Sequence, residues 1–450
     1  MLDGIRSKLA RAIAPTGLAL RKIDSGSFAP RTQGFGVFGR TQPEVSAAAT
    51  VTRSRARYLA TSNPWIANAV GNWTGALIGA GITPTGSPDD VANFLAWGRS
   101  ADFDGRTDFN GLLVEIARAM VVDGESFIRL HFGLTGLKLQ ILPAEMVDES
   151  RTAELANGGY VVQGVEFDAT GQRVAYHVLP HRPTDQFSRF TSPIRVPAAE
   201  ILHVFRPIGA GQVRGISWLA PIVVPASEFD AIVDALAVGI KISALHAGFI
   251  VDQNGTGGAF DDADGDGEMS MEPGTVRRLP AGTDIRFSSP EQAKDIGPFL
   301  SFQLRQLAAG LGLPSHMVDG DLSQANYSSL RAGLLPFRTR VEQVQYSVLV
   351  PQLLDPVWAR VTLAPPPEWL PPAFMQVDPA KQVEADVAEI EAGLASRRQK
   401  IAERGWNADA LDAEIAADRA RESALGLSFG TAPAAAESPS TEQQEQPPHD

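Results

Sequence analysis

The densest group of potential metal ligands in the chain is an acidic run that spans residues 262–268. Its aspartates Asp262, Asp264 and Asp266 alternate with small residues, which is how a calcium-binding EF-hand loop begins. Such a loop needs a bidentate glutamate at its twelfth position, which is Pro273 here, and Glu272 misses that position by one residue. The flanking residues do not have the pattern of paired helices. The sequence therefore favours a solvated acidic loop, and it leaves open whether this run binds a divalent ion.

Other combinations of residues with catalytic potential are weaker. His177 and His181 have the spacing of metal ligands on a helix, but Pro180 and a strand-like pattern oppose a helix there. The sequence contains no Gly-x-Ser-x-Gly elbow, no Walker-type phosphate loop and no cysteine. We therefore expect no enzyme activity, no cofactor and no metal. Within the enzyme class, the alternative is a metal-dependent hydrolase that uses the acidic run.

Three arginines, Arg214, Arg331 and Arg338, could contact phosphate. The formal net charge of −13 opposes general nucleic-acid binding, because that affinity comes mostly from Lys and Arg that neutralise phosphates. In an assembly these arginines could instead pair with acidic residues of a neighbouring subunit, and the acidic composition favours this structural role. Only residues 1–57 are basic, with ten Lys and Arg residues against three acidic ones.

The residue patterns predict an α+β chain that is mainly helical. Residues 1–50 have little periodicity and predict a loosely ordered basic arm. Helical spacing from residue 53 to residue 78 is interrupted at Asn63-Pro64, which is typical of a helix start. A further helix is expected from Asn110, as its N-cap, to Val122. Residues 126–205 form short β-prone runs, among them Tyr160 to Val165.

The second half of the chain returns to helical spacing. We expect a helix from an N-cap at Ser227 to Gly248, a small acidic insert, a helix from Pro298 to Gly312, and a loop of about a dozen residues. A long helix from residue 328 to residue 360 should kink at Pro336 and Pro351. A proline-rich linker over 364–372 precedes three helices with caps at Asp378, Ser396 and Asn407, and residues 430–450 should be disordered. No apolar run is long enough to span a bilayer, and no signal peptide is expected.

Several motifs follow one another along the chain: Asp123-Gly124-Glu125, Gly211-Gln212-Val213-Arg214-Gly215, the helix end from Ala308 to Pro314, Asn326-Tyr327-Ser328-Ser329-Leu330-Arg331, and Asp378-Pro379-Ala380-Lys381. In this order they resemble the lambda-type portal family of tailed bacteriophages. The match covers roughly residues 50–425, is strongest from Ile296 to Arg331, and departs from the family pattern at Ala210 and Leu330.

The resemblance implies a ring subunit, with twelve copies expected, built from regions that are named in that family. These are a wing over 51–217 of mixed helix and strand, stem helices over 218–247 and 298–314, and a clip over 248–297. A tunnel loop over 315–327, a kinked long helix with its linker over 328–377, and crown helices over 378–429 complete the layout. The arm (1–50) and the tail (430–450) lie outside the match.

The implied function is mechanical: a channel at one capsid vertex for the packaging and ejection of double-stranded DNA. The tunnel loop, with Asp319, Asp321, Gln324 and Asn326 and no Lys or Arg, would repel DNA or touch it weakly. The implied partners are further copies of the chain, the major capsid protein, the terminase large subunit, head-completion or adaptor proteins and the passing DNA, with no membrane. The implied location is the virion, and the host cytoplasm during assembly. The alternative is a non-viral ring or scaffold protein, and the ring number, the host, the tail type and cleavage of the arm stay open.

Overall fold

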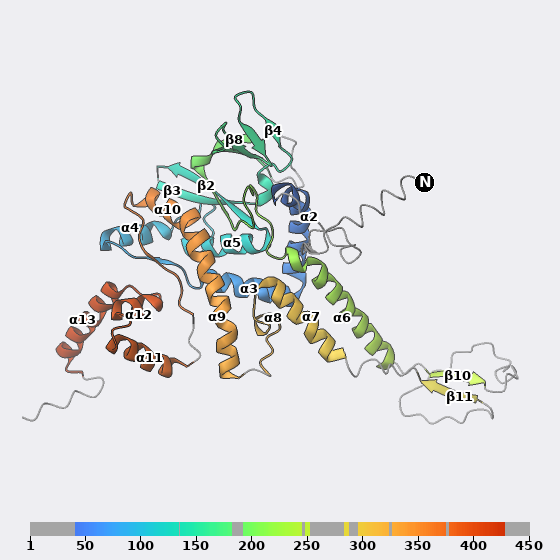
Figure 1. Cartoon of the computed structure of the whole chain (residues 1–450). Coiled ribbons are helices and arrows are strands. Elements are labelled where there is room, and N and C mark those ends of the chain that lie inside the picture. The colour runs from blue at the N-terminus through green and yellow to red at the C-terminus, as the bar shows by residue number, and fades with distance from the viewer. Residues whose placement is uncertain are drawn as a thin grey trace, which may run out of the picture.

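The computed structural model of the chain describes residues 41–134, 136–181, 192–244, 248–252, 283–287, 296–323, 326–374 and 378–427 (Figure 1). Its α-helices are α2 (Thr41–Ser62), α3 (Pro64–Ile78), α4 (Pro88–Gly98), α5 (Phe109–Val122), α6 (Val223–Ala244), α7 (Ile296–Leu311), α8 (His316–Asp319), α9 (Tyr327–Val344), α10 (Asp355–Val361), α11 (Pro379–Glu391), α12 (Arg397–Glu403) and α13 (Ala408–Leu425). A π-helical segment, η7 (Gln345–Leu354), joins α9 to α10.

The described strands form four antiparallel sheets. A three-stranded sheet has the order β3 (Gly136–Leu142), β2 (Glu125–Gly133), β9 (Ile201–Phe205), and a five-stranded sheet has the order β4 (Ala153–Glu154), β5 (Tyr160–Val162), β6 (Val165–Phe167), β7 (Arg173–Val178), β8 (Ile194–Pro197). Two pairs complete the set: β1 (Thr83–Pro84) with β12 (Trp369–Leu370), and β10 (Gly248–Asp252) with β11 (Thr283–Phe287). The expected α+β fold, with helix predominating, is what the structure shows.

The folded chain already includes α2 from Thr41, so the prediction of a loose arm over 1–50 is wrong for its last ten residues. Val45 and Ala49 are buried and continue the apolar stripe of Ala56 and Leu59 at helical spacing. Residues 1–40 of the predicted arm lie outside the described residues.

The predicted helix start at Asn63-Pro64 is confirmed. The Asn63 side-chain oxygen accepts a hydrogen bond from the Ile66 amide at 2.9 Å, and its Nδ2 donates to Asp230 on α6 at 2.7 Å. The N-cap of α5 is Asp108 rather than Asn110, because Asp108 Oδ1 accepts the Gly111 amide. Asn110 fills the space beside Gly81 instead.

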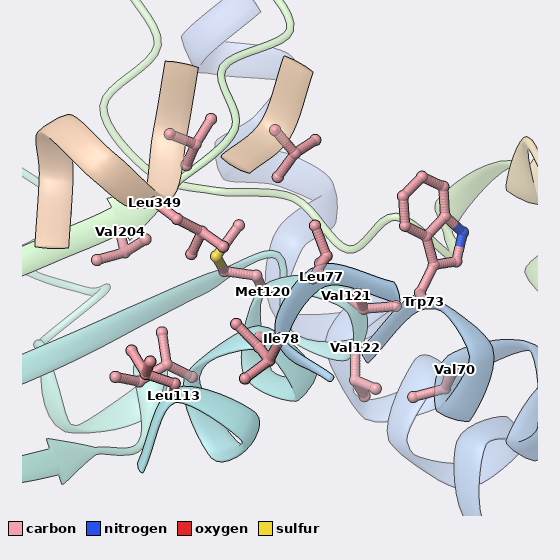
Figure 2. Packing of buried hydrophobic residues seen from close by; sticks show 14 of the residues in the cluster. Val70, Trp73, Leu77, Ile78, Leu113, Met120, Val121, Val122, Val204 and Leu349 are labelled. Atoms are coloured by element: carbon pink, nitrogen blue, oxygen red, sulfur yellow. The ribbon is translucent and has the colours of Figure 1, made fainter. Parts of the chain in front are cut away.

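The main core lies where α3, α5, β9 and η7 meet (Figure 2). Figure 2 shows side chains from all four elements in one cluster: Val70, Trp73, Leu77 and Ile78 of α3, Leu113, Met120, Val121 and Val122 of α5, Val204 of β9, and Leu349 of η7. Segments nearly 300 residues apart in the sequence therefore share one apolar interior.

Sharp turns divide the β region more finely than its composition indicates. The expected run from Tyr160 to Val165 is a hairpin, because Gln163 and Gly164 both have positive φ angles, 46° and 81°, and form a two-residue turn between β5 and β6. This paired left-handed geometry matches the twist of the strands that it joins.

The helix α6 starts earlier than its cap signal predicted. It follows the 3-10 turn η5 (Ala220–Ile222) directly, so Ser227 lies in the second turn and is not the N-cap. Gly248 does not close this helix either, since it begins β10. The end of α7 at Gly312 is confirmed: Gly312 has a φ angle of 71°, and Leu313 donates its amide to the Ala308 carbonyl.

Two predicted connections carry structure of their own. The expected loop over 315–327 contains the helical turn α8, which ends at Gly320 with a φ angle of 73°. The chain is then helical from Tyr327 to Val361, and the irregularity expected at Pro351 takes the form of η7. The proline-rich linker includes β12, whose Trp369 is buried beside Trp358.

The last three helices begin at the predicted caps. The side chains of Asp378, Ser396 and Asn407 each accept a backbone amide of the helix that follows. Residues 428–450, which include the predicted tail, lie outside the described residues.

Candidate functional site

The motif Gly211-Gln212-Val213-Arg214-Gly215 forms a loop after β9 that is buried from Gln212 to Gly215. Gly211 has a φ angle of 77°, and the Gln212 side chain bridges the loop by accepting the Ile208 amide at 2.7 Å and donating to the Arg214 carbonyl at 2.8 Å. From α2, Gln42 Oε1 accepts the Val213 amide at 2.6 Å. These bonds fix the backbone that presents Arg214.

Arg214 is almost completely buried, with 1% of the residue exposed. Its Nη2 donates to Glu125 Oε1 at 2.7 Å and its Nε donates to Glu125 Oε2 at 3.1 Å, in the forked geometry that suits a carboxylate. Its guanidinium also donates to three backbone carbonyls, those of Ala144, Val147 and Gln163. One side chain thus joins the first residue of β2 to the turns that lead into the five-stranded sheet.

Glu125 is the centre of this buried site. Its Oε2 accepts the Gly215 amide at 2.8 Å and lies 3.0 Å from His203 Nε2. Burial opposes its ionisation, but the charge of Arg214 and the bond with His203 outweigh burial and hold the pKa of Glu125 well below its usual range. Glu125 is therefore a carboxylate inside the protein.

Two glycines let the backbone before Glu125 and the backbone after Arg214 come close together. A side chain on Gly215 would place its Cβ 2.2 Å from the Gly124 carbonyl oxygen, and one on Gly124 would lie 2.1 Å from the Ile216 backbone. Only residues without a Cβ let the two backbones come this close. The Asp-Gly-Glu and Gly-Gln-Val-Arg-Gly motifs are therefore two halves of one contact.

The charge network extends to α2 through two further arginines. Arg53, also buried, donates to Glu149 at 2.5 Å and lies 3.3 Å from Glu125. Arg57 pairs with both Asp123 and Glu145. Both arginines belong to the basic start of the chain, and their charges are neutralised within the fold.

His203 closes the other side of Glu125. Its ring stacks on Phe127, which faces it across the β2–β9 pair, with 4.2 Å between the ring centroids. Burial lowers the pKa of His203 to about 4, although the Glu125 carboxylate favours the protonated form. The imidazole is therefore neutral at pH 7.

The predicted tunnel loop is anchored on one side and exposed on the other. Asn68 and Asn72 of α3 donate to the Met317 carbonyl, and Val318 is buried. Asp319 Oδ1 accepts the Asp321 amide at 2.9 Å, and Asp321 itself is exposed. Hydrogen bonds from the Ser323 side chain and amide lower the pKa of Asp321. Gln324 lies outside the described residues.

The second family motif begins α9. Asn326 is its N-cap and forms a capping box with Ser329, since each side chain bonds to the other residue's backbone. Tyr327 is the first helical residue, and Ser328 and Arg331 are exposed. Arg338, two turns further, pairs with Glu342 at 2.7 Å.

The histidine pair weighed for metal binding is not brought together on a helix. His177 lies in β7, buried, with Nε2 3.0 Å from Glu166, and His181 follows the strand. No group of three or more potential ligands gathers within the part of the chain that the structure describes. The acidic run over 262–268 lies outside that part.

The sequence alone does not identify the partners of Arg214. It indicates Glu125 only as part of a motif, and it predicts no role for Arg53, Glu149 or His203. The available signal was a glutamate at the start of an apolar strand, where an uncompensated charge would be costly to bury. The structure buries the Arg214 guanidinium among acidic side chains and carbonyls of its own chain, instead of exposing it to phosphate or to a neighbouring subunit.

We expect Arg214→Met to destabilise the chain by on the order of 3 to 5 kcal/mol, because Glu125 would stay buried without its main counter-charge. Arg106→Met is the matched control: it breaks an exposed pair with Glu115 and should cost less than about 1 kcal/mol. Urea unfolding of both variants gives the comparison. Equal effects in the two variants would contradict a central role for the Glu125–Arg214 pair.

His203 should make stability depend on pH. Because folding depresses its pKa, the unfolded chain binds the proton more readily between pH 6.5 and 4, so stability falls as the pH falls through that window. The wild type should lose about 1.5 kcal/mol more than His203→Gln between pH 6.5 and pH 5. Urea unfolding at both pH values measures this, and parallel pH profiles would rule the assignment out.

Comparison with known proteins agrees with the order of the motifs. The family described as "Phage portal protein, lambda family" matches residues 32–345. The probable portal protein of Halomonas phage phiHAP-1 is 26% identical over 368 residues, which cover 74% of this chain and 70% of that protein. Portal protein B of Escherichia phage lambda is 22% identical over 379 residues, which cover 72% of this chain and 71% of that protein.

Among solved structures, a chain from the neck of an empty GTA particle has a TM-score of 0.48 at 18% identity, covering 85% of this chain and 99% of that one. The family match spans well over half of the sequence and includes the buried Glu125–Arg214 site, the predicted tunnel loop and the start of α9. The chain belongs to the lambda family of phage portal proteins.

Proposed function

We propose that the chain forms a closed ring, with twelve copies expected, that conducts double-stranded DNA through one capsid vertex. The observation that carries this proposal is the predicted tunnel loop, which is fastened to α3 through the carbonyls of Met317 and Val318 and exposes the side chains of Asp321 and Asn326. It has no Lys or Arg in its sequence.

Electrostatics explains why such a loop suits a channel. A duplex carries about one negative charge per 1.7 Å, and a basic lining would hold its phosphates by releasing counterions. Asp321 stays ionised, because the Ser323 hydrogen bonds favour its charged form. A ring of such loops would repel the phosphates and let DNA slide.

The remaining regions fit the roles that the family layout gives them. In this proposal α6 and α7 are stem helices that lead to the β10–β11 clip, residues 51–217 form the wing, and α11 to α13 form the crown. The major capsid protein, the terminase large subunit and head-completion or adaptor proteins would dock on this ring. The protein would be located in the virion, and in the host cytoplasm during assembly.

Family membership favours this function over a non-viral scaffold or a metal-dependent hydrolase. The arginines Arg53, Arg57 and Arg214 each form ion pairs with acidic residues of the same chain, so the described charge network stabilises the fold. Among the described residues, no helix combines the length and the apolar character that crossing a bilayer requires.

Purified chain should form closed rings with a central hole. Helices α6 and α7 expose large apolar side chains, among them Val238 at 51% and Phe302 at 62%, and a neighbouring copy would cover them. Electron microscopy and sedimentation at micromolar concentration test this. A purely monomeric profile in moderate salt would overturn the proposal.

Replacing both Asp319 and Asp321 with Lys should slow packaging or ejection without preventing ring assembly. The substitution converts a repulsive ring into one that attracts phosphates, and the defect should shrink as salt rises from about 50 mM to 200 mM. The matched control, Asp319→Asn with Asp321→Asn, removes charge without adding attraction and should leave the rate closer to that of the wild type. Normal rates for the Lys variant in low salt would show that the loop does not face the DNA.

A further inference from the structure

One face of α6 combines apolar residues with unpaired acidic residues. Val224, Glu228, Ala231, Asp234 and Val238 follow one another at helical spacing, and all five are exposed. Neither Glu228 nor Asp234 makes an ion pair with another described residue. We call these five residues the α6 face.

A second exposed surface has the opposite charge. Arg305 is the only charged residue of α7, and Arg331 is the only one in the first half of α9. Both are exposed, and neither pairs with a described acidic residue. On α7, Arg305 lies one turn after Phe302, and on α9, Arg331 lies one turn before Leu335; these two apolar side chains are 62% and 56% exposed. We call these four residues the α7–α9 face.

The two faces cannot meet within one subunit. Helices α6 and α7 pack against each other, and each buries the side opposite to its charged face. On α6 the buried side carries Ala226 and Phe229, and on α7 it carries Leu307 and Leu311. The charged sides of α6 and α7 therefore point away from each other, and Figure 1 shows α6 and α9 on opposite flanks of α7.

We propose that the α6 face of one subunit docks on the α7–α9 face of the next copy around the ring. The inference rests on the proposed ring and names the surfaces that close it. Two different, complementary patches on opposite sides of a subunit generate a head-to-tail contact, which closes into a ring when the rotation allows. Opposite charges set among exposed apolar side chains favour the correct partner and the correct register.

This assignment gives Arg331 of the second family motif a partner. In the subunit, Arg331 follows the capping box and has no described acidic neighbour. The α6 face of a second copy offers two carboxylates to the two arginines. Contact of Arg331 with DNA phosphate is the competing outcome that the experiment separates.

Paired charge reversals test the contact. One variant carries Glu228→Arg and Asp234→Arg, and the other carries Arg305→Glu and Arg331→Glu. Each variant alone would bring like charges together, so the concentration needed for half-assembly should rise by about tenfold or more. An equimolar mixture restores opposite charges at every contact and should form rings in which the two variants alternate.

Native mass spectrometry identifies such rings by equal numbers of the two variants, and rescue in the mixture shows that both are folded. The matched control reverses two exposed acidic residues on α13, Glu414→Arg with Asp418→Arg, and this variant should assemble as the wild type does.

Failure of the mixture to form rings, while the wild type forms them, would overturn the pairing. If the Arg305→Glu, Arg331→Glu variant assembles normally but retains DNA less well, the arginines contact DNA instead. If the wild type itself forms no rings, the result counts against the proposed function.

Discussion

The buried ion pair between Glu125 and Arg214 is the interaction on which the sheets and helices around it depend. A carboxylate and a guanidinium in the interior are costly unless each finds partners, and here every described contact of the pair lies within the chain. The pair connects α2, the start of β2 and the turns before the five-stranded sheet. Because Gly124 and Gly215 bring two backbones together at the same point, a change at any of these residues affects all of these elements.

Acidic residues at and around this site neutralise three of the protein's arginines. Arg53, Arg57 and Arg214 are neutralised by acidic residues of their own fold, so their charges do not contribute to a basic surface. The predicted tunnel loop has no Lys or Arg, and Asp321 stays ionised. Both arrangements agree with the proposed channel, because neither these three arginines nor the predicted tunnel loop offers a free positive charge to phosphates.

The helices α3, α6, α7 and α9 combine firm anchoring with exposed charge. α3 holds α8 through Asn68 and Asn72, while η7 packs into the main core through Leu349. The predicted tunnel loop and the start of α9 therefore extend from a fixed base. The exposed faces of α6, α7 and α9 remain for partners, and their opposite charges agree with repeated head-to-tail contacts.

Short-range chemistry made part of this structure predictable from the sequence alone. Caps at Asn63, Asp378, Ser396 and Asn407, and the helix end at Gly312, each depend on bonds within one turn, so local patterns identified them. The order of the motifs likewise identified the family. Only the tertiary structure showed that α2 begins at Thr41, that Ser227 lies inside α6, that residues of the linker pair with β1, and that Arg214 meets Glu125. These features depend on contacts between distant segments, 89 residues apart for Arg214 and Glu125, which no local pattern encodes.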